Sequence, residues 1–170
     1  MFLNILKYKI LKKSAEAQLL KGQKIDLLGE IKEVGVILNQ KDFPNRELII
    51  QELSKHRIKP EQLVFLISNA DLKTLKANEI AIKASHFDTR GQLKDEKVEG
   101  FIQKKFELLI SYYDLDEPLL LWCTAHSKAK FKVGFSSVKI NNNHFVLQLE
   151  TGQHKSYIDE LFRYIEILKK

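Results

Sequence analysis

Two polar segments of the sequence carry residue types that could recognise a sugar or another polyol. The first follows an apolar run at residues 33–38, and the second ends an apolar run that begins at Phe106. Ligands bind outside the carboxyl ends of the strands in an open α/β sheet, so we expect both segments to line one crevice. The candidate ligand-binding residues are Asn39, Asp42, Ser111, Tyr112, Tyr113 and Asp114.

A purely structural interpretation of the second segment stays open. Asp114, Asp116 and Glu117 precede Pro118, which is typical of a helix start. Acidic residues there cap free N–H groups and interact favourably with the helix dipole. Tyrosines at a strand end often pack half-buried, so this loop alone does not distinguish a site from a capped helix.

No nucleophile, metal site or cofactor site follows from the other reactive residues. Cys123 and His126 would share one helix face, but no third group is placed to orient them. The run LLLWCTA instead favours a small buried cysteine. The other histidines lack ligand spacing on one element, so we predict no metal site and assign no catalytic residue.

The sequence has no glycine-rich phosphate loop. Neither Gly-x-Gly-x-x-Gly after a strand nor Gly-Lys-Ser/Thr occurs, and a backbone needs such glycines to approach a pyrophosphate closely. We therefore predict no dinucleotide or nucleoside triphosphate cofactor.

Apolar runs alternating with helical patterns predict the α/β class. We expect a three-layer α/β/α sandwich with a Rossmann-like, mostly parallel sheet of five to six strands. The last strand would be antiparallel, because a short turn at residues 141–143 precedes it. The expected strands lie at residues 33–38, 63–67, 79–83, 106–112, 130–135 and 144–149, and the expected helices at residues 1–20, 45–56, 94–104, 117–127 and 156–168.

The basic character of the chain is concentrated at its N-terminus. Residues 1–24 carry six lysines against Glu16 alone, which gives +5 of the net charge of +6. We expect an amphipathic helix here, followed by one domain at residues 25–170. The helix either packs on that domain or contacts an anionic membrane or a partner protein. The residues for such a contact are Lys7, Lys9, Lys12 and Lys13.

Composition limits the remaining classes. A nearly neutral body makes nucleic-acid binding an unfavoured interpretation. The single cysteine excludes an intrachain disulfide and fits a reducing compartment. No apolar run is long enough to span a bilayer, so we expect a cytoplasmic protein, with peripheral contact at the inner membrane surface as an extension. A homodimer is compatible with the sequence.

The region from Phe106 to Phe135 resembles the first domain of heptosyltransferase-type glycosyltransferases. That resemblance implies a Rossmann-like domain with an active site between two such domains. This sequence shows no match for the second domain, which holds the nucleotide-sugar donor, and its turn at residues 39–43 has Asp42 but no glycine. The residues that carry the resemblance are Leu108, Leu109, Ile110, Leu119–Ala125, Ala129, Lys130, Val133, Gly134 and Phe135, with a weaker match at Val34–Ile37.

The whole chain is more similar to an uncharacterised family of short bacterial proteins. The shared features are the basic N-terminal helix, a strand like Val34–Leu38, and the stretches FELLISYY and KAKFKVGF. This resemblance implies a fold but no activity. Two hypotheses follow: a non-catalytic binding or interaction protein, and an enzyme or degenerate glycosyltransferase-like domain that binds a sugar or phosphosugar in the crevice.

Overall fold

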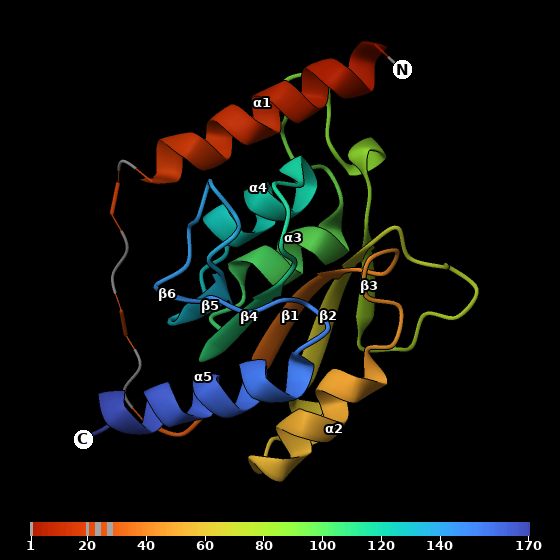
Figure 1. The fold of residues 1–170 in the computed structure, drawn as a ribbon. Coiled ribbons are helices and arrows are strands. Elements are labelled where there is room, and N and C mark those ends of the chain that lie inside the picture. Colours follow the sequence, from red (N-terminus) through yellow and green to blue (C-terminus); the bar gives the residue numbers. More distant parts are fainter. Residues whose placement is uncertain (1, 20, 23–24, 27–28) are drawn as a thin grey trace.

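Apolar runs rich in valine, leucine and isoleucine form the central sheet, as burial on both faces requires. The structure is a computed structural model that describes residues 2–19, 21–22, 25–26 and 29–170. Within these residues the sheet has six strands in the order β3-β2-β1-β4-β5-β6 (Figure 1). The strands are β1 (Val34–Asn39), β2 (Leu63–Ser68), β3 (Glu79–Ile82), β4 (Leu108–Tyr112), β5 (Lys132–Phe135) and β6 (Phe145–Leu147).

Every neighbouring pair of described strands is parallel, which confirms the predicted α/β class. The expectation of an antiparallel last strand is wrong, because β6 pairs with β5 in parallel register. The connecting residues 136–144 do not form one tight turn. Val138 and Ile140 are buried in the core on one face of the sheet, so the connection crosses back before β6 begins.

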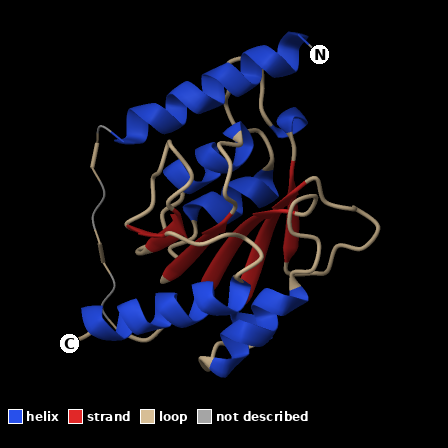
Figure 2. Cartoon of the chain, in the orientation of Figure 1, coloured by secondary structure: helices blue, strands red, loops and turns tan. Residues whose placement is uncertain are grey.

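The helices cover both faces of the sheet (Figure 2). One apolar core lies between the sheet and α2 and α5, and the other lies between the sheet and α3 and α4. A further helix, α1, lies across the outer side of α4 (Figure 1). The helices are α1 (Phe2–Leu19), α2 (Glu47–Lys55), α3 (Glu96–Gln103), α4 (Pro118–His126) and α5 (His154–Leu168).

The position of α1 explains the composition of α4. Every residue from Leu119 to Ala125 is buried, and a helix that is apolar all round needs cover on all sides. The sheet covers one side of α4, and α1 covers the other. Leu11 and Ala15 are the fully buried residues of α1 among those described. The helix therefore packs on its own domain through one side.

Polar contacts fix α1 in this position. The Asn142 side chain donates to the Ala15 carbonyl at 3.1 Å, and Ser14 Oγ lies 3.1 Å from His126 Nε2.

Gly91, with φ of +77°, lies so close to Ile10 that a Cβ there would be 2.5 Å from Ile10 Cγ2. A loop that approaches a helix this closely requires a glycine.

Candidate functional site

β2 and β3 follow β1 on one side of it in the sheet, whereas β4, β5 and β6 follow on its other side. The chain leaves β1 through α2 on one face and leaves β4 through α4 on the other. A crevice opens at the carboxyl ends of strands at such a point, and ligands of open α/β sheets bind there. The residues at this point are Asn39, which ends β1, and Glu117, which precedes α4.

Asn39 is the centre of a hydrogen-bond network at this edge. Its Nδ2 donates to Asp42 Oδ2 at 3.0 Å and to Glu117 Oε2 at 2.9 Å. Its Oδ1 accepts from Asn69 Nδ2 at 2.9 Å and from the Lys41 backbone N–H at 3.0 Å. All the hydrogen-bonding capacity of this buried amide is thus used to hold its neighbours. The structure therefore brings the predicted residues Asn39 and Asp42 together.

The Glu117 side chain does not cap the helix that it precedes. It occupies the N-cap position of α4, yet its side chain makes no capping hydrogen bond. The carboxylate turns toward Asn39 instead. Burial raises the pKa of Glu117 above its ordinary value, the hydroxyl of Ser68 and the amide of Asn39 partly offset this, and the charge of Asp42 adds to it. A desolvated carboxylate beside a cavity is a functional-site candidate.

A pocket of about 380 Å³ adjoins this carboxylate. It lies at the carboxyl ends of β2 and β3 and is covered by Tyr8 of α1. Ser68 is 1% exposed, and its Oγ makes no hydrogen bond of standard geometry, although it lies near enough to Glu117 to favour the ionised carboxylate. The lining residues are Tyr8, Ser68, Asn69, Ala70, Ile82, Lys83, Ala84, Glu117 and Leu119.

Asn69 lines this pocket and has an uncommon backbone conformation. Its φ is +52°, in the left-handed region that asparagine tolerates better than most residues. The turn aims its side chain at Asn39 and ends β2 at the pocket wall. The sequence-based candidates do not include Asn69 and Ser68, and Glu117 enters the sequence analysis only as part of the acidic segment before Pro118. The contact between Asn39 and Glu117 joins positions 78 residues apart, so only the strand order reveals it.

Ser111 and Tyr113 lie in the core between β4 and α4. Ser111 Oγ is 3.0 Å from Thr124 Oγ1, and the Tyr113 hydroxyl is 2.7 Å from the same atom. Burial raises the pKa of Tyr113. These hydroxyls satisfy one another inside the protein and attach α4 to the sheet, so neither residue lines the pocket beside Glu117.

Tyr112 faces the other side of the sheet. Successive residues of a strand face opposite sides of the sheet, and Tyr112 packs on the α5 side, edge-on to Phe43 and Tyr157. Its hydroxyl donates to the Thr151 carbonyl. The backbone carbonyl of Asp114 accepts from Ser137 Oγ at 2.9 Å. The hydrogen bonds of the Asn39 side chain all go to other residues, so neither Tyr112 nor Asp114 is part of its network.

The predicted lysines separate into two groups on α1. Lys7 is partly buried, and its Nζ donates to the Ala84 carbonyl at 3.3 Å, beside the pocket. Lys9, Lys12 and Lys13 are exposed. These three lysines point away from the domain, whereas Lys7 helps to hold α1 over the pocket.

The described residues contain no group of three or more histidine, cysteine or acidic side chains arranged to hold a metal ion. Cys123 is fully buried, and burial raises the pKa of its thiol. His126 stacks on Trp122 at 4.1 Å and contacts Ser14 of α1. This cysteine and histidine therefore serve the packing of α4.

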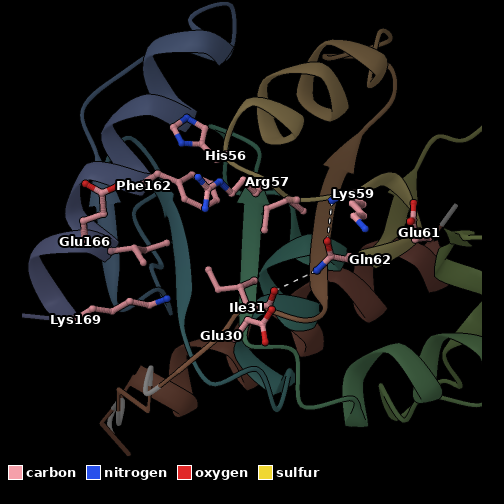
Figure 3. Close-up of a pocket in the computed structure, with 12 residues that line it drawn as sticks. Glu30, Ile31, His56, Arg57, Lys59, Glu61, Gln62, Phe162, Glu166 and Lys169 are labelled. Atoms are coloured by element: carbon pink, nitrogen blue, oxygen red, sulfur yellow. Dashed lines mark hydrogen bonds between the residues drawn. The ribbon is translucent and has the colours of Figure 1, made fainter.

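A larger pocket, of about 700 Å³, lies beside the amino ends of β1 and β2, opposite to the carboxyl ends described above (Figure 3). Its wall includes the ring of His56 stacked on Phe162 at 4.3 Å. Gln62 Nε2 donates to the Ile31 carbonyl at 3.1 Å, and its Oε1 accepts from the Lys59 backbone, so these polar groups satisfy each other (Figure 3). The rim carries three acidic and three basic side chains, so their formal charges cancel: Glu30, Glu61 and Glu166, and Arg57, Lys59 and Lys169. This pocket lies away from the edge where α/β sheets bind ligands.

The parallel sheet in the order 3-2-1-4-5-6, with polar side chains at its switch point, defines a Rossmann-like α/β protein. The chain belongs to DUF6913, a family of unknown function whose model matches residues 6–168. This match confirms the resemblance to an uncharacterised family. No curated protein and no solved structure matched the chain. The resemblance to heptosyltransferases stays a prediction.

Proposed function

We propose that this protein is a non-catalytic binding protein that holds a small polyol of the sugar class at the carboxyl edge of its sheet. One observation carries the proposal: the Glu117 carboxylate is desolvated, makes no cap, and faces a pocket that Asn69 and Ser68 also line. Pockets of this kind combine apolar walls with a few convergent polar groups.

The lining chemistry fits hydroxyl groups in particular. A carboxylate accepts hydrogen bonds from hydroxyls, whereas serine and asparagine side chains both donate and accept. Tyr8, Ile82 and Leu119 provide apolar surface for the carbon skeleton of the ligand. Lys83 at the same wall is the cation that would meet a phosphate, so sugar phosphates form a second class of ligand to test.

We propose binding rather than catalysis because, among the described residues, Glu117 is the one acidic residue that lines this pocket. Glycoside hydrolysis ordinarily requires two carboxylates that flank the bond. Asp42 accepts from the same Asn39 Nδ2 as Glu117 does, but it is not part of the pocket wall. An enzyme or a degenerate glycosyltransferase-like domain remains the alternative, favoured by the crevice at the switch point.

We further propose that the protein works in the cytoplasm. Its single thiol, Cys123, is free and buried, which suits a reducing compartment. Among the described helices, none combines the length and the apolar character needed to cross a membrane.

Thermal unfolding in the presence of monosaccharides, polyols and sugar phosphates tests the proposal. A ligand at about 100 times its Kd stabilises the native state by roughly 2.7 kcal/mol, which corresponds to a rise of roughly 5–10 °C in Tm for a chain of this size. Replacing Glu117 by Gln keeps the shape of the side chain but removes a charged acceptor, so binding should weaken by about 10- to 100-fold. Ser68→Ala should weaken it as well.

The matched control is Asp116→Asn. Asp116 is adjacent to Glu117 but accepts from the Lys139 backbone and does not line the pocket, so this variant should bind like wild type. Lys83→Gln should weaken sugar phosphates and spare neutral sugars. The proposal fails if the whole panel leaves Tm unchanged, or if the shift persists in both Glu117→Gln and Ser68→Ala.

A further inference from the structure

Helix α1 has apolar residues on two opposite sides. Its inner side buries Leu11 and Ala15 against the domain. Its first turns expose other large apolar side chains: Phe2 is 78% exposed, Leu3 57%, Ile5 49% and Leu6 41%. Residues at positions 2, 5 and 6 lie on one side of a helix, and that side is opposite to Leu11. The exposed apolar residues thus do not contribute to the packing of α1 on α4.

Lysines continue this outer side toward the middle of the helix. Lys9 lies three residues after Leu6, and Lys13 follows one turn later, so both share the side of Phe2 and Leu6. Lys12 is exposed beside them. Glu16 is the one acidic residue in the described span of α1. We call this surface, formed by Phe2, Ile5, Leu6, Lys9, Lys12 and Lys13, the outer face of α1.

A helix face that combines exposed apolar side chains with lysines suits the surface of an anionic bilayer. Apolar side chains enter the boundary between acyl chains and headgroups, and lysines meet the anionic headgroups. Since the inner side of α1 is already docked on α4, the helix would lie on the surface and carry the folded domain with it. It is not suited to span the membrane.

The charge on this face argues against a second copy of the chain as its occupant. Two outer faces in contact would bring together the lysines of both copies, and like charges at close range are unfavourable. Only Glu16 is present in the described part of the helix to compensate them. Anionic lipid supplies the complementary charge that a second copy does not.

We propose that the outer face of α1 binds an anionic lipid surface, with Phe2, Ile5 and Leu6 entering the interface and Lys9, Lys12 and Lys13 contacting headgroups. This interaction is independent of the pocket beside Glu117, whose residues lie on the other side of α1. Each lysine near an anionic surface adds to the attraction, and the attraction decreases as salt screens the charges.

Co-sedimentation with vesicles tests this proposal on the full chain. Phosphatidylcholine mixed with phosphatidylglycerol should bind the protein, and phosphatidylcholine alone should bind it far less. Replacing Lys9, Lys12 and Lys13 together by Gln should lower the partition coefficient on the order of a hundredfold. Phe2→Ser with Leu6→Ser should also weaken binding by more than about tenfold. All these side chains are exposed, so Tm should stay unchanged.

Matched controls use exposed residues elsewhere on the chain. Lys73, Lys105 and Lys155 replaced by Gln remove the same charge, and Leu72→Ser with Leu115→Ser removes two exposed apolar side chains. Both controls should bind like wild type. The proposal is overturned if neutral vesicles bind equally well, if the controls lose as much binding as the α1 variants, or if no vesicle binds. It is also overturned if sedimentation velocity shows that Phe2→Ser with Leu6→Ser only dissociates a dimer.

Discussion

At the residue scale, one buried amide organises the candidate site. Asn39 uses both hydrogens and both lone pairs to hold Asp42, Glu117, Asn69 and the Lys41 backbone. Two carboxylates near each other repel, and an amide donating to both reduces that cost. Asn39 therefore allows Glu117 to remain beside a cavity instead of turning into solvent.

Arg46 and Glu79 form a second buried polar pair, which has a structural role. Arg46 Nε donates to Glu79 Oε1 at 2.6 Å, and both residues are less than a tenth exposed. Burial opposes ionisation of Glu79, but the hydrogen bonds from Arg46 and the Lys76 backbone hold its pKa below the ordinary value of 4.5. We predict that Glu79→Gln lowers the free energy of unfolding by about 3–5 kcal/mol, because it leaves the guanidinium buried without its charged partner.

Urea denaturation at several pH values measures this effect. The folded pKa of Glu79 is depressed, so its contribution is complete above pH 4.5 and is lost as the pH falls through the lower folded value. The difference between wild type and Glu79→Gln should shrink in that acidic range. The control is Glu47→Gln, whose exposed ion pair with Lys76 should matter by less than about 1 kcal/mol. Equal losses in the two variants would contradict the assigned role.

At the element scale, α4 requires a cover, and α1 provides it. Leu11 is fully buried, whereas Leu19 on the same helix is 40% exposed. We predict that Leu11→Ala lowers the free energy of unfolding by about 2–5 kcal/mol, as expected for a core leucine. Leu19→Ala should cost less than about 1 kcal/mol. Chemical denaturation compares the two variants, and similar small losses would show that α1 contributes little to the packing of α4.

His126 makes the contact between these helices sensitive to acid. Burial lowers its pKa, the hydrogen bond to the Trp122 carbonyl opposes this, and Lys132, Lys128 and Lys21 add to the lowering. The unfolded chain therefore binds more protons than the folded chain between the folded pKa and about 6.5, so stability falls as the pH drops through this range.

We predict that His126→Gln removes this component of the pH dependence. Hydrogen exchange of α1 amides should increase in wild type as the pH falls below about 6.5, after correction for intrinsic rates. In the variant, protection of α1 should no longer change over that range. A pH dependence that persists unchanged in His126→Gln would assign the effect to another group.

At the scale of the whole molecule, apolar runs were sufficient to predict the fold class. Val34–Leu38 and Leu108–Ile110 are buried on both faces, so their patterns admit little besides a central parallel strand. The direction of β6 was not predictable in this way. It depends on how residues 136–144 pack, and that loop has no periodic pattern.

The candidate site was predictable only in part, for a physical reason. Asn39 and Asp42 are close in sequence, so a turn at the end of β1 places them together. Glu117 meets Asn39 only because β4 is the neighbour of β1 in the sheet. The orientation of Tyr112 and Tyr113 depends on where β4 ends, since each additional strand residue faces the opposite side.

The most direct test of the account is backbone NMR during titration with the monosaccharide or sugar phosphate that most raises Tm. Binding at the proposed pocket should shift the amide resonances of residues 68–70, 83–84 and 117–119, which form its walls. The same titration of Glu117→Gln should show these shifts only at higher ligand concentration. Shifts confined to residues 56–62 and 162–169 would place the ligand in the pocket at the opposite edge of the sheet. That result would contradict the account.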